Sequence, residues 1–215
     1  SLDFGIKYYN IIMIATNVFF IHFVCYWIMV YLYDKNVFYD WTIVLDRPVR
    51  LSLKNQILYT YPTLNLLFRY YPISYDNFLF SFGYLPILAV VGDIYFYIAH
   101  RPLHTKTLFK YHQSHHKGRI RVAKALDGDA IEHIVGNLGS VISGILLLQY
   151  IGFIINIYIL GLWVGIATIT TCYSHSTYNC PLDDGLHYLH HRKLRCNYGT
   201  GLYLMDRLVG TYRTE

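Results

Sequence analysis

Long stretches without a charged residue divide this chain. No Asp, Glu, Lys or Arg occurs from residue 8 to residue 33, and none occurs in the 49 residues from 134 to 182. A helix rises about 1.5 Å per residue, so about 20 apolar residues cross the hydrocarbon core of a bilayer. The first stretch is long enough for one crossing and the second for two. The pattern predicts a membrane protein that crosses the bilayer several times.

The low share of charged residues and the other apolar spans predict one all-α domain over residues 1–215. It is expected to be a bundle of about four transmembrane helices. Charged residues make up only 14% of the chain, against about 25% in ordinary globular domains. A third apolar span covers 77–99, with Asp93 inside it, and a break near 149–152 is expected to turn 134–182 into a helical hairpin. The shorter segment 55–68 contains Pro62. It is either a re-entrant or interfacial piece or a kinked crossing.

Nine of the eleven histidines lie in or near short clusters beside the apolar spans. The clusters are His100-Arg-Pro-Leu-His104, His112-Gln-Ser-His115-His116 and His187-Tyr-Leu-His190-His191, and the ninth residue is His175. Residues three and four apart share a face of a helix, so each cluster is expected to aim its imidazoles one way. Neutral imidazole is a common ligand of iron and zinc. Eight or nine imidazoles exceed the needs of one ion, which predicts two metal ions and redox or oxygen chemistry.

The other histidines and the cysteines receive ordinary structural interpretations. His22 stands alone in the first span and is expected to pack there, and His133 starts a span and is expected at the membrane interface. None of the four cysteines forms a Cys-x-x-Cys pair, so no disulfide framework or zinc knuckle is predicted. They are Cys25, Cys172, Cys180 and Cys196.

The position of the basic residues predicts the orientation in the membrane. The hairpin leaves one side and returns to it, so all three histidine clusters are expected on the same side. Residues 101–133 hold seven Lys and Arg and residues 183–215 hold five, out of 18 in the chain. Basic loops favour the cytoplasmic side, so the histidine clusters are predicted to form a cytoplasmic cap. The net charge of +5 is thus explained by topology, and no nucleic-acid partner is predicted.

The ordered motifs resemble the fatty acid hydroxylase / sterol desaturase superfamily of integral-membrane di-iron oxygenases. The resemblance covers residues 93–212: the three clusters and His175, then Asn197-Tyr198-Gly199, and Asp206-Arg207-Leu208-Val209-Gly210-Thr211 at the end. Three positions depart from the usual pattern. Asp129 replaces a histidine before Glu132, Met205 replaces a tryptophan, and Thr177 replaces a glycine.

The resemblance implies a site and a reaction. Two iron ions, with zinc as a substitute in purified protein, are implied to be held by His100, His104, His112, His115, His116, His175, His187, His190 and His191. The reaction that the resemblance implies uses dioxygen and electrons from another protein to hydroxylate or desaturate a lipid. The lipid is a sterol, a fatty acyl chain or a sphingoid base. Short stretches near His175 and Cys196 look like the sterol-modifying branch.

Further assignments concern supporting residues, partners and location. Asp93 and Glu132 are candidates to hold the second nitrogen of a ligand histidine, although a solvated acid is an alternative for both, and Asn197 is a further supporting candidate. The resemblance implies a separate electron-transfer chain, such as a b-type cytochrome and its reductase, and the endoplasmic reticulum or an equivalent membrane. Two other functions are alternatives: an inactive relative with a structural or regulatory role, and a histidine-rich metal transporter.

Overall fold

The described part of the protein is almost entirely helical. The computed structural model describes residues 2–34, 37, 46–176 and 185–215. Apart from helices and turns, these residues contain one isolated parallel bridge, between Ser74 and Asn156. The predicted all-α fold is therefore confirmed.

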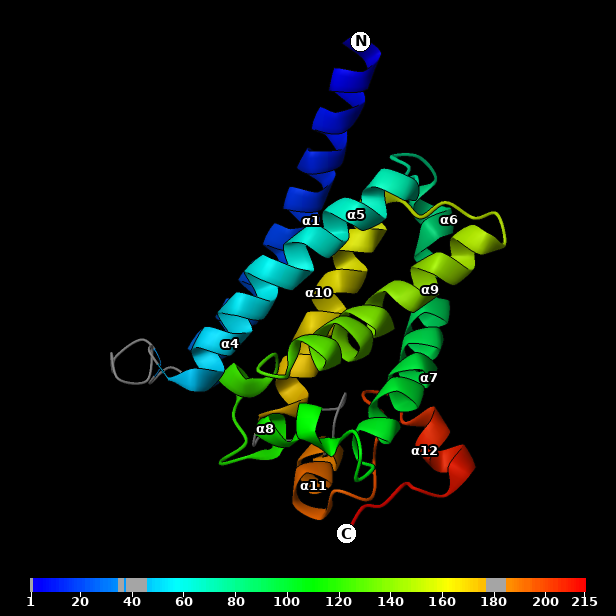
Figure 1. Ribbon diagram of the computed structural model, residues 1–215. Coiled ribbons are helices and arrows are strands. Elements are labelled where there is room, and N and C mark those ends of the chain that lie inside the picture. The colour runs from blue at the N-terminus through cyan, green and yellow to red at the C-terminus, as the bar shows by residue number, and fades with distance from the viewer. Residues whose placement is uncertain (1, 35–36, 38–45, 177–184) are drawn as a thin grey trace.

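The N-terminal third forms an antiparallel pair of long helices (Figure 1). Helix α1 (Leu2–Tyr33) runs toward the end of the molecule that carries α8 and α11. Three segments then form one helical run back to the opposite end: α4 (Arg47–Asn55), the π-helix η1 (Gln56–Thr60) and α5 (Tyr61–Tyr70). Pro62 lies in the first turn of α5, directly after the π-helical turn of η1, which adjusts the helical run to the missing amide hydrogen of the proline.

Residues 55–68 lie in this returning run. Both α1 and α7 (Leu85–Leu103) run toward the same end of the bundle, so the chain between them must return. The segment therefore runs back beside α1, which favours a kinked crossing, and its place in the bilayer stays a prediction. It is not one of the four helices that are long and apolar enough to cross a membrane by composition alone.

Four candidate membrane spans build the rest of the bundle: Asn10–Tyr33, Phe78–Leu103, Glu132–Tyr150 and Ile157–Ser174. The second contains α6 (Phe78–Phe82) and α7, and the third joins the π-helix η4 (Glu132–Leu138) to α9 (Gly139–Tyr150). Helix α10 (Ile157–Ser174) forms the fourth. The predicted break is confirmed, because α9 ends at Tyr150 and Gly152 takes a φ of 89° that favours glycine.

Close helix contacts hold these spans together. Helix α9 packs on α7, and α10 packs on α1. A side chain at Gly144 would place its Cβ 3.0 Å from the Cα of Leu88, so the missing side chain lets α9 approach α7. Small residues allow the same close approach between helices in membranes generally.

Short helices gather into a cap at one end of the bundle, where α7 and α10 end (Figure 1). They are η2 (Phe109–Tyr111), α8 (Gln113–His116), η3 (Val122–Lys124), α11 (Leu186–Lys193) and α12 (Leu204–Val209). The hairpin therefore returns the third histidine cluster to the end that carries the first two, as predicted. The cytoplasmic location of this end stays a prediction.

The two isolated histidines lie inside the bundle. His22 is buried and its Nδ1 lies 2.9 Å from Thr168 Oγ1, in agreement with a packed residue. His133 lies at the start of the third candidate span, as predicted, and its side chain is fully buried, with Nε2 2.9 Å from Thr60 Oγ1. It is buried because 47–70 covers η4, which no apolar pattern in the sequence indicates. Cys25, Cys172 and Cys196 are free, and Cys180 lies outside the described residues.

Candidate metal centre

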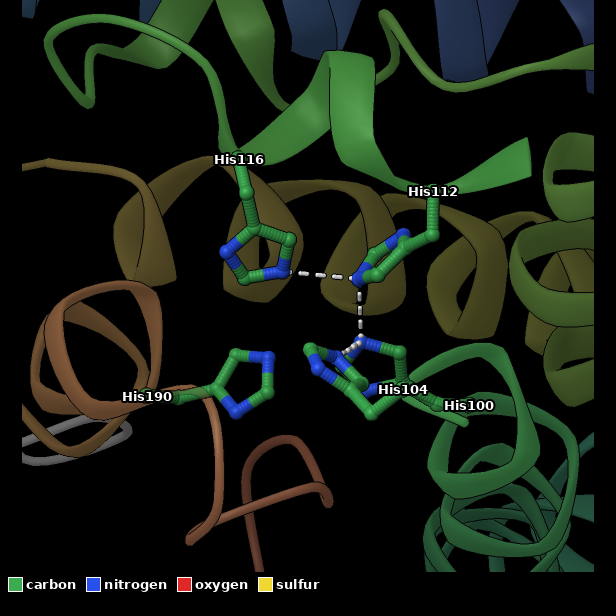
Figure 2. A group of neighbouring side chains, drawn as sticks. All are labelled: His100, His104, His112, His116 and His190. Atoms are coloured by element: carbon green, nitrogen blue, oxygen red, sulfur yellow. Dashed lines mark hydrogen bonds between the residues drawn. The ribbon is translucent and has the colours of Figure 1, made fainter. Parts of the chain in front are cut away.

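The nine histidines of the clusters come together at the cap and form two groups. Within each group, one ring nitrogen from every member lies within 4.8 Å of the others. The five-histidine group consists of His100, His104, His112, His116 and His190 (Figure 2), and the four-histidine group consists of His115, His175, His187 and His191. The two groups adjoin, since the ring centroids of His116 and His191 are 4.2 Å apart.

Each His-x-x-His-His cluster is shared between the two groups, which corrects the expectation that each cluster aims one way. Helix α8 and His112, the residue directly before it, give His112 and His116 to the five-histidine group and His115 to the other. Helix α11 gives His187 and His191 to the four-histidine group and His190 to the other. Residues four apart stay together because they are separated by only about 40° around a helix, whereas the intervening histidine is turned aside.

Backbone carbonyls fix the tautomer of three of these histidines. The Nδ1 atom of His100 lies 2.7 Å from the carbonyl oxygen of Tyr198, and that of His190 lies 2.7 Å from the carbonyl of Cys196. His175 Nδ1 lies 2.8 Å from the carbonyl of Thr171. A carbonyl oxygen only accepts hydrogen bonds, so each Nδ1 carries the hydrogen and each Nε2 presents a bare lone pair.

These lone pairs face other histidine nitrogens at short range. His100 Nε2 lies 2.9 Å from His112 Nε2 (Figure 2), and His175 Nε2 lies 2.9 Å from His115 Nε2. The Nε2 atom of His190 has no hydrogen-bond partner although it is buried. Metal–nitrogen bonds of about 2.0–2.1 Å place neighbouring ligand nitrogens about 3 Å apart. The donor set and its spacing therefore fit a metal ion in each group.

Two buried carboxylates support the histidines of α8. His115 Nδ1 lies 2.9 Å from Asp127 Oδ1, and His112 Nδ1 lies 2.9 Å from Glu132 Oε1. A carboxylate behind a metal-binding histidine orients the ring and raises its basicity. The geometry thus places Glu132 where it was predicted to act. Asp127 was missed, because it lies in a loop and no helical spacing relates it to His115.

Burial sets the protonation of the groups outside the spans. It lowers the pKa of His104 to about 2, of His116 to about 3 and of His175 to about 4, because the charged form loses its hydration. It also lowers the pKa of the five other cap histidines, His112, His115, His187, His190 and His191. Burial raises the pKa of Asp127 to about 7. Neutral imidazoles are the form that binds metal.

The prediction that Asp93 holds a histidine nitrogen is wrong. Its carboxylate accepts hydrogen bonds from the backbone amides of Tyr203 (2.8 Å) and Leu204 (2.9 Å), at the start of α12. The physical reason is that α12 presents unpaired amides at its first turn, and a carboxylate is a favourable partner there. Asp93 therefore anchors the C-terminal segment to α7.

Asp206 organises the loop that holds His100, a role that sequence reasoning did not assign. Its carboxylate accepts hydrogen bonds from the backbone amides of Tyr198 (2.8 Å) and Gly199 (2.6 Å) and from Thr211 Oγ1 (2.6 Å). A Cβ at Gly199 would lie 2.9 Å from Asp206 Oδ2, so the loop requires glycine there. Asp206 thereby fixes the carbonyl of Tyr198 behind His100.

Asn197 supports the start of α11 rather than a histidine ring. Its side-chain nitrogen donates hydrogen bonds to the carbonyls of Leu186 (3.1 Å) and Arg213 (2.8 Å), and its oxygen accepts one from the amide of Arg213. Leu186 directly precedes His187. Asn197 therefore acts on the four-histidine group through the backbone.

A small cavity touches both histidine groups from the side of the bundle. Its volume is about 30 Å³, and its wall includes His100 and His112 of one group and His115, His175 and His187 of the other. Phe96, Asn137 and Thr171 line it as well. Both groups therefore border the same cavity.

Comparison with known proteins agrees with this geometry. The fatty acid hydroxylase family model matches residues 85–211, more than half of the chain. The chain belongs to this family. It is 29% identical over 136 residues to methylsterol monooxygenase 1 of Rattus norvegicus and 28% identical over 134 residues to a putative methylsterol monooxygenase of Dictyostelium discoideum. It is 31% identical over 132 residues to a fatty acid hydroxylase of Mycosarcoma maydis.

These similarities cover part of each protein. They span 57% of this chain for both methylsterol monooxygenases and 60% for the hydroxylase. They cover 48%, 44% and 33% of the Dictyostelium, rat and Mycosarcoma relatives, so the chain spans at most about half their length. No solved structure matches the chain significantly.

Proposed function

We propose that the protein is a membrane-bound di-iron oxygenase that hydroxylates a lipid, with the nine cap histidines as ligands. The observation that carries the proposal is the set of bare Nε2 atoms facing one another in two adjoining groups. When bound there, two iron ions would supply the reduction of dioxygen and the oxidation of an unactivated C–H bond. Family membership and relatives that are lipid oxygenases by name support this reaction class.

The residues of the chain position this chemistry. Tyr198, Cys196 and Thr171 hold three imidazoles through their carbonyls, while Asp127 and Glu132 hold two more. Burial keeps the imidazoles neutral and excludes water that would compete for the ions. The cavity of about 30 Å³ borders both histidine groups on the side of the bundle, and we place the reacting carbon of the lipid there.

Partners and location follow from the proposed reaction. Oxidation by dioxygen needs electrons, which we assign to a separate b-type cytochrome and its reductase. Twelve of the 18 Lys and Arg lie in residues 101–133 and 183–215, which supports a cytoplasmic cap in the endoplasmic reticulum or an equivalent membrane. The basic cap can attract an acidic electron carrier.

Isotope labelling tests the reaction. Membranes containing the protein, an electron donor and ¹⁸O₂ are expected to yield a lipid with one ¹⁸O atom in a new hydroxyl group. The His115→Ala variant is expected to yield none, and lipid profiling identifies the substrate among sterols, fatty acyl lipids and sphingoid bases. We favour hydroxylation because it needs one positioned C–H bond, whereas a desaturated product without label would assign the other outcome.

The same experiment separates the two other functions. An inactive relative binds iron and accepts electrons but consumes no oxygen with any of these lipids. A transporter moves metal across vesicles and also leaves the lipid unchanged. Transport sites usually lie near the bilayer midplane, whereas the histidine groups lie at the ends of the spans.

A further inference from the structure

A second cavity lies deeper in the bundle, next to the cavity that touches the histidine groups. Its volume is about 50 Å³, and Asn137 and Thr171 line both cavities. His22 and His133, the two histidines outside the metal centre, also line it. Leu64, Val141 and Val164 make part of its apolar wall.

The hydrogen bonds around His22 fix its tautomer. Thr168 Oγ1 donates a hydrogen bond to the carbonyl of Val164 at 2.7 Å, so it cannot also donate to His22. His22 Nδ1, 2.9 Å from the same Oγ1, must therefore carry the hydrogen. His22 Nε2 is then a bare acceptor, and it is buried without a partner. A buried acceptor of this kind is unfavourable unless a donor reaches it.

His133, which lines the same cavity, differs from His22 because both of its ring nitrogens have hydrogen-bond partners. Thr60 Oγ1 donates to the carbonyl of Asn55, so His133 Nε2 donates to Thr60 Oγ1 at 2.9 Å. His133 Nδ1 then accepts from Asn137 Nδ2 at 3.4 Å. Both nitrogens of His133 are paired within the protein, which leaves His22 as the histidine of this cavity that can receive an outside donor.

Both π-helices of the described chain contribute to this wall. Thr60 belongs to η1, while His133, Asn137 and Leu138 belong to η4. A π-helical turn costs helical regularity and occurs frequently at functional sites. Two such turns facing one cavity point to a binding role for it.

We infer that this cavity binds the hydroxyl group of the lipid substrate, with His22 Nε2 as the acceptor. The inference rests on the proposed function and narrows its substrate to lipids that bear a free hydroxyl. A cavity of about 50 Å³ has room for a hydroxyl and the carbon next to it, since one water occupies about 30 Å³ in the liquid. An ester or ether oxygen has no hydrogen to donate, so it does not satisfy Nε2.

The position of the site relative to the metal centre is set by α10. Thr168 precedes His175 by seven residues, which is about 10 Å along a helix. A hydroxyl at His22 therefore places a carbon roughly 10 Å away near the four-histidine group. Product mapping is expected to find the oxidised carbon at about that distance from the substrate hydroxyl.

Binding of matched alcohols and ethers tests the inference on the purified, iron-loaded protein. The probes are radiolabelled cholesterol and 1-hexadecanol, each compared with its methyl ether. In at least one pair, the wild type is expected to bind the alcohol about tenfold more tightly, as one buried hydrogen bond allows. His22→Leu is expected to reduce this preference to within about twofold, and His22→Gln, which keeps an acceptor, to retain part of it.

The matched control is Thr16→Val, which removes another polar group of α1, one bonded to Tyr61, and is expected to keep the tenfold preference. Equal binding of alcohol and ether by the wild type overturns the inference and assigns the cavity to a resident water. Failure to bind either pair, or an unchanged preference in His22→Leu, also overturns it. Label incorporation from ¹⁸O₂ is scored separately, so a preference for alcohols without oxidation would reject the proposed function alone.

Discussion

The two sides of the metal centre support their histidines by different means. On the α8 side, the Nδ1 atoms of His112 and His115 contact the carboxylates of Glu132 and Asp127. On the opposite side, the Nδ1 atoms of His100 and His190 donate hydrogen bonds to backbone carbonyls of the 196–198 loop. A carboxylate can be changed by one substitution with little effect on the chain path. A carbonyl is placed by the fold, so that side depends on whatever fixes the loop.

Loss of a histidine from either side is expected to have the largest effect. His112→Ala and His191→Ala should each abolish lipid oxidation, because each group loses an ion ligand. Insertion should be unchanged, since neither residue lies in an apolar span. Product analysis and alkaline extraction of membranes measure the two properties. Arg192→Ala, an exposed neighbour in α11, serves as control, and full activity in either histidine variant would contradict its role as a ligand.

Asp206→Ala should come next, because it removes the support of the carbonyl side. The amides of Tyr198 and Gly199 lose their acceptor, at a cost of about 1–3 kcal/mol for each buried group. The melting temperature and the iron content are expected to fall together. Asp76→Ala, at an exposed site, should leave both unchanged. Retained stability and retained iron would show that the loop keeps its path without Asp206.

Asp127→Asn and Glu132→Gln test the carboxylate side. Each is expected to weaken metal binding by about 10–100-fold, the usual effect of losing such a partner. The melting temperature of the metal-free protein should change less than in Asp206→Ala, because an amide oxygen can still accept from the imidazole. Competition with a chelator measures the affinity. A stability loss as large as that of Asp206→Ala would mean that both sides depend on the fold equally.

Acid should produce the smallest change. An ordinary imidazole has a pKa of about 6.5 and takes up a proton as the pH falls below that value. Burial lowers the pKa of His104 to about 2, of His116 to about 3 and of His175 to about 4. The neutral, metal-binding form therefore persists well below pH 6.5. From pH 7.5 to 5.5 only Asp127, whose pKa burial raises to about 7, is expected to take up a proton, which should weaken iron binding no more than Asp127→Asn does. Release of all the iron with a midpoint near 6.5 would indicate exposed ligands.

Periodicity and hydropathy predicted the spans, the break near Gly152 and the shared location of the clusters. These features could be predicted because hydropathy and helical spacing depend only on residues that are close together in the sequence. The division of the two His-x-x-His-His clusters between the two groups was not predicted, although His115 and His116 point in different directions from His112 on a helix. His115 was assigned to the same side as His112 because residues three apart contact each other on a helix surface. Such contact does not require that both side chains converge on one ion.

The supporting residues were the hardest to predict, for a physical reason. A carbonyl such as that of Tyr198 has no side-chain signature, and Asp127 meets His115 only through the loop between α8 and η4. Asp93 was assigned the wrong partner, and the burial of His133 was not predicted, because the residues they contact, Tyr203 and Thr60, are distant in sequence. Long-range partners of buried polar groups are set by packing, which one sequence does not display.

The sharing of α8 and α11 between the two groups has a consequence for metal loading. A four-residue helix such as α8 is too short to be stable by itself, because fixing its backbone costs more than its few hydrogen bonds return. If the proposed ions bind, one held by His112 and His116 would order α8 and thereby position His115 in the other group. The ordering entropy of α8 would then already be lost when the other group is filled, so uptake of the two ions would be positively cooperative.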